Sequence, residues 1–144
     1  MYTRIIPKMQ YYGSPCSHVA VQTARDELIM DDIRPVGDKW LPRIKSKDGW
    51  CTLSDMNRCV RKYFNVAKRV DYKRGQRPTL SYFLRNIENM FGNEYLSYSA
   101  IIVVYGHCIF MDKNKNYYSY YENEDDEVVA VWFLKNEHIS GAVG

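Results

Sequence analysis

The chain has 144 residues, of which 46% are hydrophobic and 26% charged, and its formal net charge at pH 7 is +3. This length and composition predict one globular domain over residues 1–144 and exclude two comparable domains. The chain opens MYTRIIPKM without the apolar run of a signal peptide, and no segment has the length of a membrane span, so we expect a cytoplasmic protein without a membrane partner.

The first predicted helix covers residues 17–30, where apolar side chains recur at helical spacing after a Gly-Ser-Pro turn at residues 13–15. Prolines and glycines between residues 31 and 50 predict an irregular connection. A second helix is expected to begin after Thr52, because Thr52 and Asp55 have the spacing of a capping box with Asp in place of Glu.

The second helix is followed by a strand candidate at residues 65–70 and by a third helix that begins after the cap Thr79 and ends at Gly92. The pattern then changes to strands, with a hairpin loop at residues 112–116. The strand candidates are LSYSAIIVVY, HCIFMD, NYYSYY and EVVAVWFL.

This order of elements predicts an α+β protein in which N-terminal helices pack on a C-terminal antiparallel sheet. We expect the core to span about residues 10–135 and residues 136–144 to form a tail.

A basic segment at residues 51–77 carries eight cationic side chains against two aspartates, which is 8 − 2 = +6. Such a segment is typical of a solvated face, and its alternative is a surface for an acidic partner such as nucleic acid. The basic residues are Arg58, Arg61, Lys62, Lys68, Arg69, Lys73, Arg74 and Arg77.

Cys16 is the candidate nucleophile, since it stands behind the Gly-Ser-Pro turn at the start of the first helix. The backbone N–H groups and the dipole of a helix N-terminus favour a thiolate, so we expect the pKa of this thiol to be lowered. Cys51, also at a helix entrance, is the rival by position. Cys59 and Cys108 are interpreted as structural thiols.

His107 is the candidate base, because it follows Gly106 between two strand-forming runs and far from Cys16 in sequence. His18 is closer in sequence, but residues two apart on a helix do not face each other, and His138 lies in the expected tail. The scattered histidines and the absence of a CxxC pair argue against a zinc site, and we expect no metal or organic cofactor.

Gln10 stands six residues before Cys16, and its amide together with the Cys16 backbone N–H would provide two donors for an oxyanion. This spacing resembles that of papain-like cysteine peptidases, which place the oxyanion glutamine six residues before the nucleophile and the histidine on a later strand. The segments 13–20, 52–64 and 78–83 and the Gly106-His107 pair are most similar to small papain-like proteins of bacteriophages.

The resemblance implies a third catalytic side chain after the hairpin, where those proteins usually carry an aspartate. This chain has Ser119 in that position, and a serine can hold an imidazole by a hydrogen bond but lacks a negative charge. Asn116 and Asn123 are alternatives, since an amide suffices in papain, and Asp112 sits early, near the hairpin tip.

Two functions from different classes remain open. The resemblance implies a cysteine hydrolase that acts on amide or isopeptide bonds of a protein or peptide, and acyl transfer by the same residues is not separable from hydrolysis. The alternative is a catalytically silent, phage-encoded binding protein that engages a host protein or nucleic acid through the basic segment.

Overall fold

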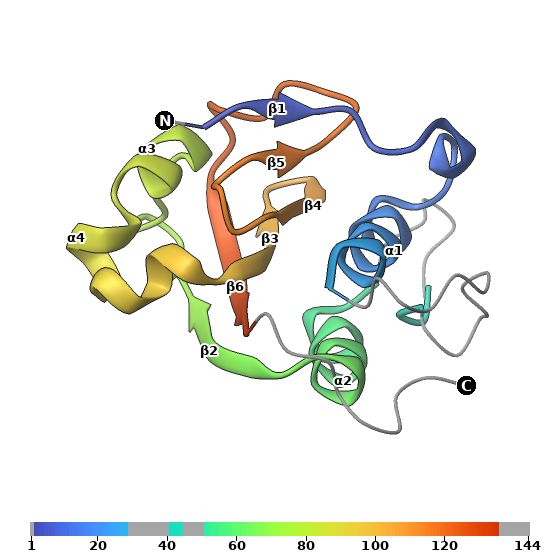
Figure 1. Ribbon diagram of the computed structural model, residues 1–144, viewed down its shortest axis with the longest axis horizontal. Helices are drawn as coiled ribbons and strands as arrows, with labels where there is room; N and C mark the ends of the chain where they lie inside the picture. Colours follow the sequence, from blue (N-terminus) through green and yellow to red (C-terminus); the bar gives the residue numbers. More distant parts are fainter. Residues whose placement is uncertain (1, 29–40, 45–50, 136–144) are drawn as a thin grey trace.

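A six-stranded sheet forms the centre of the computed structural model, which describes residues 2–28, 41–44 and 51–135 (Figure 1). Its strand order is β1-β5-β4-β3-β6-β2. The strands are β1 (Arg4–Ile5), β2 (Val66–Asp71), β3 (Ser99–Val104), β4 (His107–Met111), β5 (Tyr117–Tyr118) and β6 (Val128–Leu134).

The sheet is mixed, which corrects the purely antiparallel sheet expected from the sequence. β1 runs parallel to β5, whereas the other neighbouring strands run antiparallel. The N-terminal segment is held at this edge because the Thr3 backbone N–H donates to Asn116 Oδ1 at 3.1 Å and the Thr3 carbonyl accepts from the Tyr117 N–H at 3.0 Å. These contacts join residues more than one hundred positions apart, beyond the reach of local sequence patterns.

Helices cover both faces of the sheet in the described chain (Figure 1). On one face lie α1 (Cys16–Leu28) and α2 (Leu53–Tyr63), and on the other lie α3 (Leu80–Arg85) and α4 (Ile87–Phe91). The 3₁₀ helices η1 (Met9–Tyr11) and η3 (Asn93–Ser97) precede α1 and β3. The α+β class is therefore confirmed.

The central strands are apolar on both sides, which explains why both faces need a cover. Ile101, Phe110 and Trp132 pack with α1 and α2. Their neighbours in sequence, Ile102 and Phe133, pack with α3 instead. Because successive side chains of a strand point to opposite faces, one strand contributes to both cores.

The helix caps form as predicted. Thr52 Oγ1 accepts from the Asp55 N–H at 3.0 Å, and Thr79 Oγ1 accepts from the Tyr82 N–H at 3.2 Å. The third helix, predicted to run unbroken to Gly92, is interrupted at Asn86, whose backbone leaves the helical region and whose amide donates to the Tyr82 carbonyl at 2.8 Å. Gly92 ends α4 with φ 107°, as predicted.

No helix in the described residues has both the length and the apolarity to cross a membrane. The expected tail at residues 136–144 lies outside the described part of the chain, as do the end of the first predicted helix and most of the connection before α2.

Candidate active site

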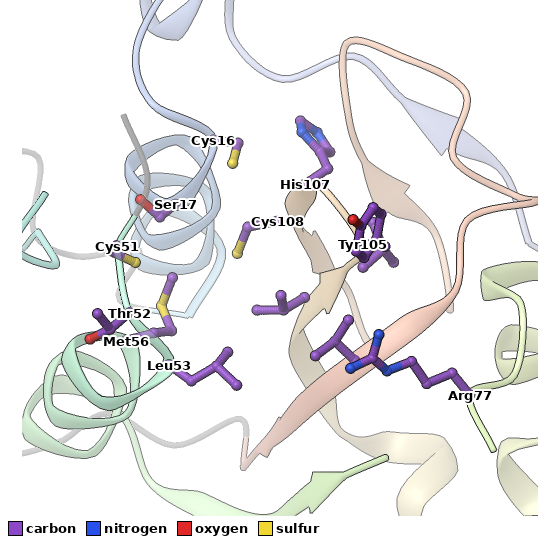
Figure 2. A pocket seen from close by; sticks show the side chains of 14 residues that line it. Cys16, Ser17, Cys51, Thr52, Leu53, Met56, Arg77, Tyr105, His107 and Cys108 are labelled. Atoms are coloured by element: carbon purple, nitrogen blue, oxygen red, sulfur yellow. The ribbon is translucent and has the colours of Figure 1, made fainter. Parts of the chain in front are cut away.

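Two cavities meet at Cys16 and His107. The first has a volume of about 590 Å³ and extends between α1, α2 and the ends of β3 and β4. The second has a volume of about 550 Å³ and lies beside Tyr118 of β5 and the two tyrosines after Ser119. Four residues line both of them: Cys16, Gly106, His107 and Cys108. Figure 2 shows Cys16 and His107 on opposite sides of the first cavity's upper end. The structure thus brings the two predicted residues to one place.

Cys16 is the first residue of α1, and the turn before it sets its position. Gly13 has φ 91°, a conformation that L side chains rarely adopt, and the Pro15 carbonyl accepts the Val19 N–H at 3.0 Å to begin the helix. The Cys16 sulfur receives a backbone hydrogen bond from Cys108, the residue after His107. The sulfur therefore lies against the start of β4.

Burial raises the pKa of the Cys16 thiol, which is opposite to the direction expected from its place at a helix start. Backbone hydrogen bonds from Cys108, Ser17 and Cys16 itself act in the lowering direction, but the loss of solvent is the larger effect. The sequence reveals the helix start, whereas the burial comes from the packing of α1 against β4. At neutral pH the resting thiol is therefore protonated.

His107 is the first residue of β4 and follows a tight turn in which Gly106 has φ 84°. Burial lowers the pKa of its imidazole below the ordinary value, and the negative charge of Asp126 partly offsets this. The imidazole is consequently neutral at pH 7 and able to accept a proton. The ring of Tyr121 stands edge-on to it, with centroids 6.1 Å apart.

Ser119, predicted for the third position, contacts His107 and begins a chain of three hydrogen bonds. His107 Nε2 lies 3.2 Å from Ser119 Oγ, Ser119 Oγ lies 2.6 Å from Asn123 Oδ1, and Asn123 Nδ2 lies 2.8 Å from Asp126 Oδ2. Both Ser119 and Asn123 are buried. We call these three residues, Ser119, Asn123 and Asp126, the relay.

The carboxylate at the end of the relay sets the direction of every hydrogen bond in it. An ionised carboxylate only accepts, so the Asn123 NH₂ faces Asp126 and the Asn123 oxygen accepts the Ser119 hydroxyl proton. The Tyr121 N–H also donates to Ser119 Oγ, at 3.1 Å. Ser119 Oγ is then left to accept from His107 Nε2–H, which makes Nδ1 the unprotonated nitrogen.

The relay supplies the negative charge that a serine in the third position lacks. The sequence predicted Asn123, like Asn116, only as an alternative to Ser119 in the third position, and it did not predict Asp126 as a site residue. The one local signal is the spacing of Ser119, Asn123 and Asp126. Asn116 lies elsewhere, since its side chain holds Thr3, and Asp112 accepts from the N–H groups of Asn114 and Asn116 within the hairpin loop.

An Asp126→Asn variant is expected to lower the rate at which p-nitrophenyl acetate acylates Cys16 about 10-fold, since it removes one charge-assisted hydrogen bond and the orientation that this bond imposes on the relay. Because the Asp126 charge raises the pKa of His107, the acid limb of the pH–rate profile should move to lower pH.

The matched control for this test is Asp125→Asn, which removes the same charge from an exposed neighbour. Burst kinetics with p-nitrophenyl acetate over a pH series measure both effects. Equal rates and equal profiles for the two variants would show that the relay does not act on His107.

Gln10 lies in η1 with an exposed side chain and lines neither of the two cavities described above. Its side chain hydrogen-bonds the Tyr11 hydroxyl, which itself donates to Asp26 Oδ2 on α1 at 2.6 Å. Lys8 also pairs with Asp26, at 3.3 Å. These contacts hold the segment before Cys16 onto α1, and the structure does not bring the Gln10 amide to the sulfur.

The remaining cysteines and histidines take other places. Cys51 lines only the first cavity, and burial raises its pKa, whereas Cys59 and Cys108 are buried in the core. His18 Nε2 lies 2.9 Å from the Pro42 carbonyl, and His138 is outside the described residues. Within the described ranges, no group of three or more His, Cys, Asp or Glu side chains is placed to hold a metal ion.

The cationic side chains of the basic segment have different surroundings in the structure. Arg58 pairs with Asp55 at 3.4 Å, and Arg69 pairs with Asp71 at 2.9 Å while stacking on Trp132. Arg77 lines the first cavity. The others are exposed on α2, on β2 or in the loop after β2: Arg61, Lys62, Lys68, Lys73 and Arg74.

No known protein family, curated protein or solved structure matches this chain.

Proposed function

We propose that this protein is a papain-like cysteine hydrolase that cleaves amide or isopeptide bonds. The observation that carries the proposal is the arrangement of Cys16 at a helix start, His107 beside it, and the relay behind His107. A nucleophile, a base and a group that orients the base are the parts that acyl transfer to a thiol requires.

In the first half of the reaction, Cys16 Sγ attacks the carbonyl carbon while His107 Nδ1 accepts the thiol proton. The C–S bond forms, and the carbonyl oxygen takes the negative charge. The backbone N–H groups of Cys16 and Ser17 at the start of α1 stabilise this oxyanion, and Ser119 stabilises the imidazolium through Nε2. The C–N bond then breaks, and His107 returns the proton to the leaving amine.

In the second half, water attacks the thioester carbon and His107 accepts the proton of that water. The C–S bond breaks, the carboxylic acid leaves, and the thiol is protonated again. The two cavities suit this sequence because each opens at Cys16, so the parts of a substrate on either side of the scissile bond have separate places.

Acyl-enzyme trapping tests the proposal. Incubation with p-nitrophenyl acetate at pH 7, followed by acid quenching and peptide mass mapping, is expected to reveal an acetyl thioester on Cys16 and a burst of p-nitrophenol. An acetyl group distributed among several cysteines, or no burst, would contradict the hydrolase and favour the silent binding protein.

A further inference from the structure

The first cavity extends from Cys16 and His107 to the side chain of Arg77 at its far side. Its walls are mainly apolar, with Leu53 and Met56 from α2 and three valines, Val103, Val104 and Val129, from the strands. Figure 2 shows the Arg77 side chain reaching toward the cavity from the side opposite α1 and α2. The cavity thus combines an apolar body with one positive charge.

The position of Arg77 is set by backbone contacts that follow it. The Pro78 carbonyl accepts the Val128 N–H at 2.8 Å, and Thr79 forms a bridge with Glu127, so the segment before α3 is held against the start of β6. These contacts place Arg77 at the cavity although it belongs to the basic segment of the sequence. Arg74, three residues earlier, is exposed.

Arg77 has no compensating partner within residues 2–28, 41–44 and 51–135. Its Nε is buried without a hydrogen-bond acceptor, and no ion pair joins its guanidinium to a described carboxylate. The acidic residue of α2, Asp55, accepts hydrogen bonds from Thr52 and Arg58. A half-buried cation beside an apolar cavity is stabilised by an anionic ligand, since burying a charge without a partner is costly.

We propose that Arg77 makes this hydrolase specific for substrates with a carboxylate, and that the substrate part held in the first cavity is an apolar chain ending in that carboxylate. The inference rests on the proposed function. A carboxylate fits because one guanidinium neutralises its single charge and matches its two oxygens with two N–H donors.

Paired alkylating probes test the specificity. N-Iodoacetyl ω-amino acids of increasing chain length are compared with their neutral primary amides, and the product on Cys16 is followed by peptide mass mapping. In each reaction the sulfur displaces iodide, so the C–S bond forms, the C–I bond breaks, and the two probes of a pair differ only in charge. The rate ratio of carboxylate to amide therefore reports on the cavity.

For at least one chain length, the ratio is expected to be about 10 or more in the wild type, fall to about 1 in Arg77→Gln and stay intermediate in Arg77→Lys. Arg74→Gln is the matched control and should keep the wild-type ratio, because it removes the same charge outside the cavity. If Arg77→Gln fails to fold, Arg77→Lys carries the test, since it keeps the charge but loses the paired donors, and its ratio should fall below those of the wild type and Arg74→Gln.

The outcomes separate the two proposals. A ratio of 1 at every chain length, or a ratio that Arg77→Gln leaves unchanged, overturns the carboxylate specificity, and the acetyl thioester on Cys16 is unaffected by that result. A preserved ratio in a protein that forms no acetyl thioester overturns the hydrolase and leaves Arg77 as an anion-binding residue.

Discussion

A Cys16→Ala variant is expected to lose the burst of p-nitrophenol and to lower the steady-state hydrolysis of p-nitrophenyl acetate to the rate of the buffer. Removal of the nucleophile from a covalent hydrolase costs about 10⁴-fold or more in turnover, since no other group forms the acyl intermediate. Cys16 is the cysteine that lines both cavities beside His107 and that also begins a helix.

Cys51→Ala is the matched control for this variant. Cys51 is also half-buried, also has a pKa raised by burial and also lines the first cavity, but it does not line the second. The control should keep the burst amplitude of the wild type. A burst that survives in Cys16→Ala and disappears in Cys51→Ala would assign the nucleophile to residue 51 and contradict the site described above.

A His107→Ala variant is expected to lower the acylation rate of Cys16 at pH 7 by about 10²–10⁴-fold. This is the usual contribution of a positioned general base. The raised pKa of the Cys16 thiol makes the base necessary, because few molecules carry a thiolate at this pH in the resting protein. His107→Gln is a second variant that keeps a polar side chain at the start of β4.

The pH dependence separates a base from a structural residue. In the wild type, the rate should fall as the pH drops through a midpoint below about 6.5, since burial lowers the pKa of His107 and only the neutral imidazole accepts the proton. Near neutral pH the rate should not depend on pH. In His107→Ala the acid limb should vanish, and the rate should rise about tenfold per pH unit until the thiol ionises. An acid limb that persists in the variant would show that another group is the base.

Several elements were predictable because their signals are local. The caps Thr52 and Thr79 and the stop at Gly92 depend on residues close in sequence, and the structure has all three. The strand predicted over residues 96–105 forms as β3 at Ser99–Val104, but its first two residues belong to η3. The break at Asn86 was missed because the apolar spacing continues through it.

The candidate site was predictable in its chemistry and less so in its geometry. A cysteine behind a Gly-Ser-Pro turn and a Gly-His pair before a strand are visible in the sequence, and the structure brings Cys16 and His107 to the same cavities. Gln10 was also predicted from its spacing, but the hydrogen bond from Tyr11 to Asp26 holds its segment on α1 and away from the sulfur. Spacing along the chain does not determine where a side chain in a loop points.

The amino-acid sequence by itself determined the order of helices and strands, the α+β class and the two reactive residue types, since these follow from periodicity, capping and turn chemistry. Only the tertiary structure decided the parallel edge strand, the raised pKa of Cys16 and the relay that ends at Asp126. The physical reason is that solvent exclusion and hydrogen-bond direction depend on which distant segments pack together, and no local pattern encodes that packing.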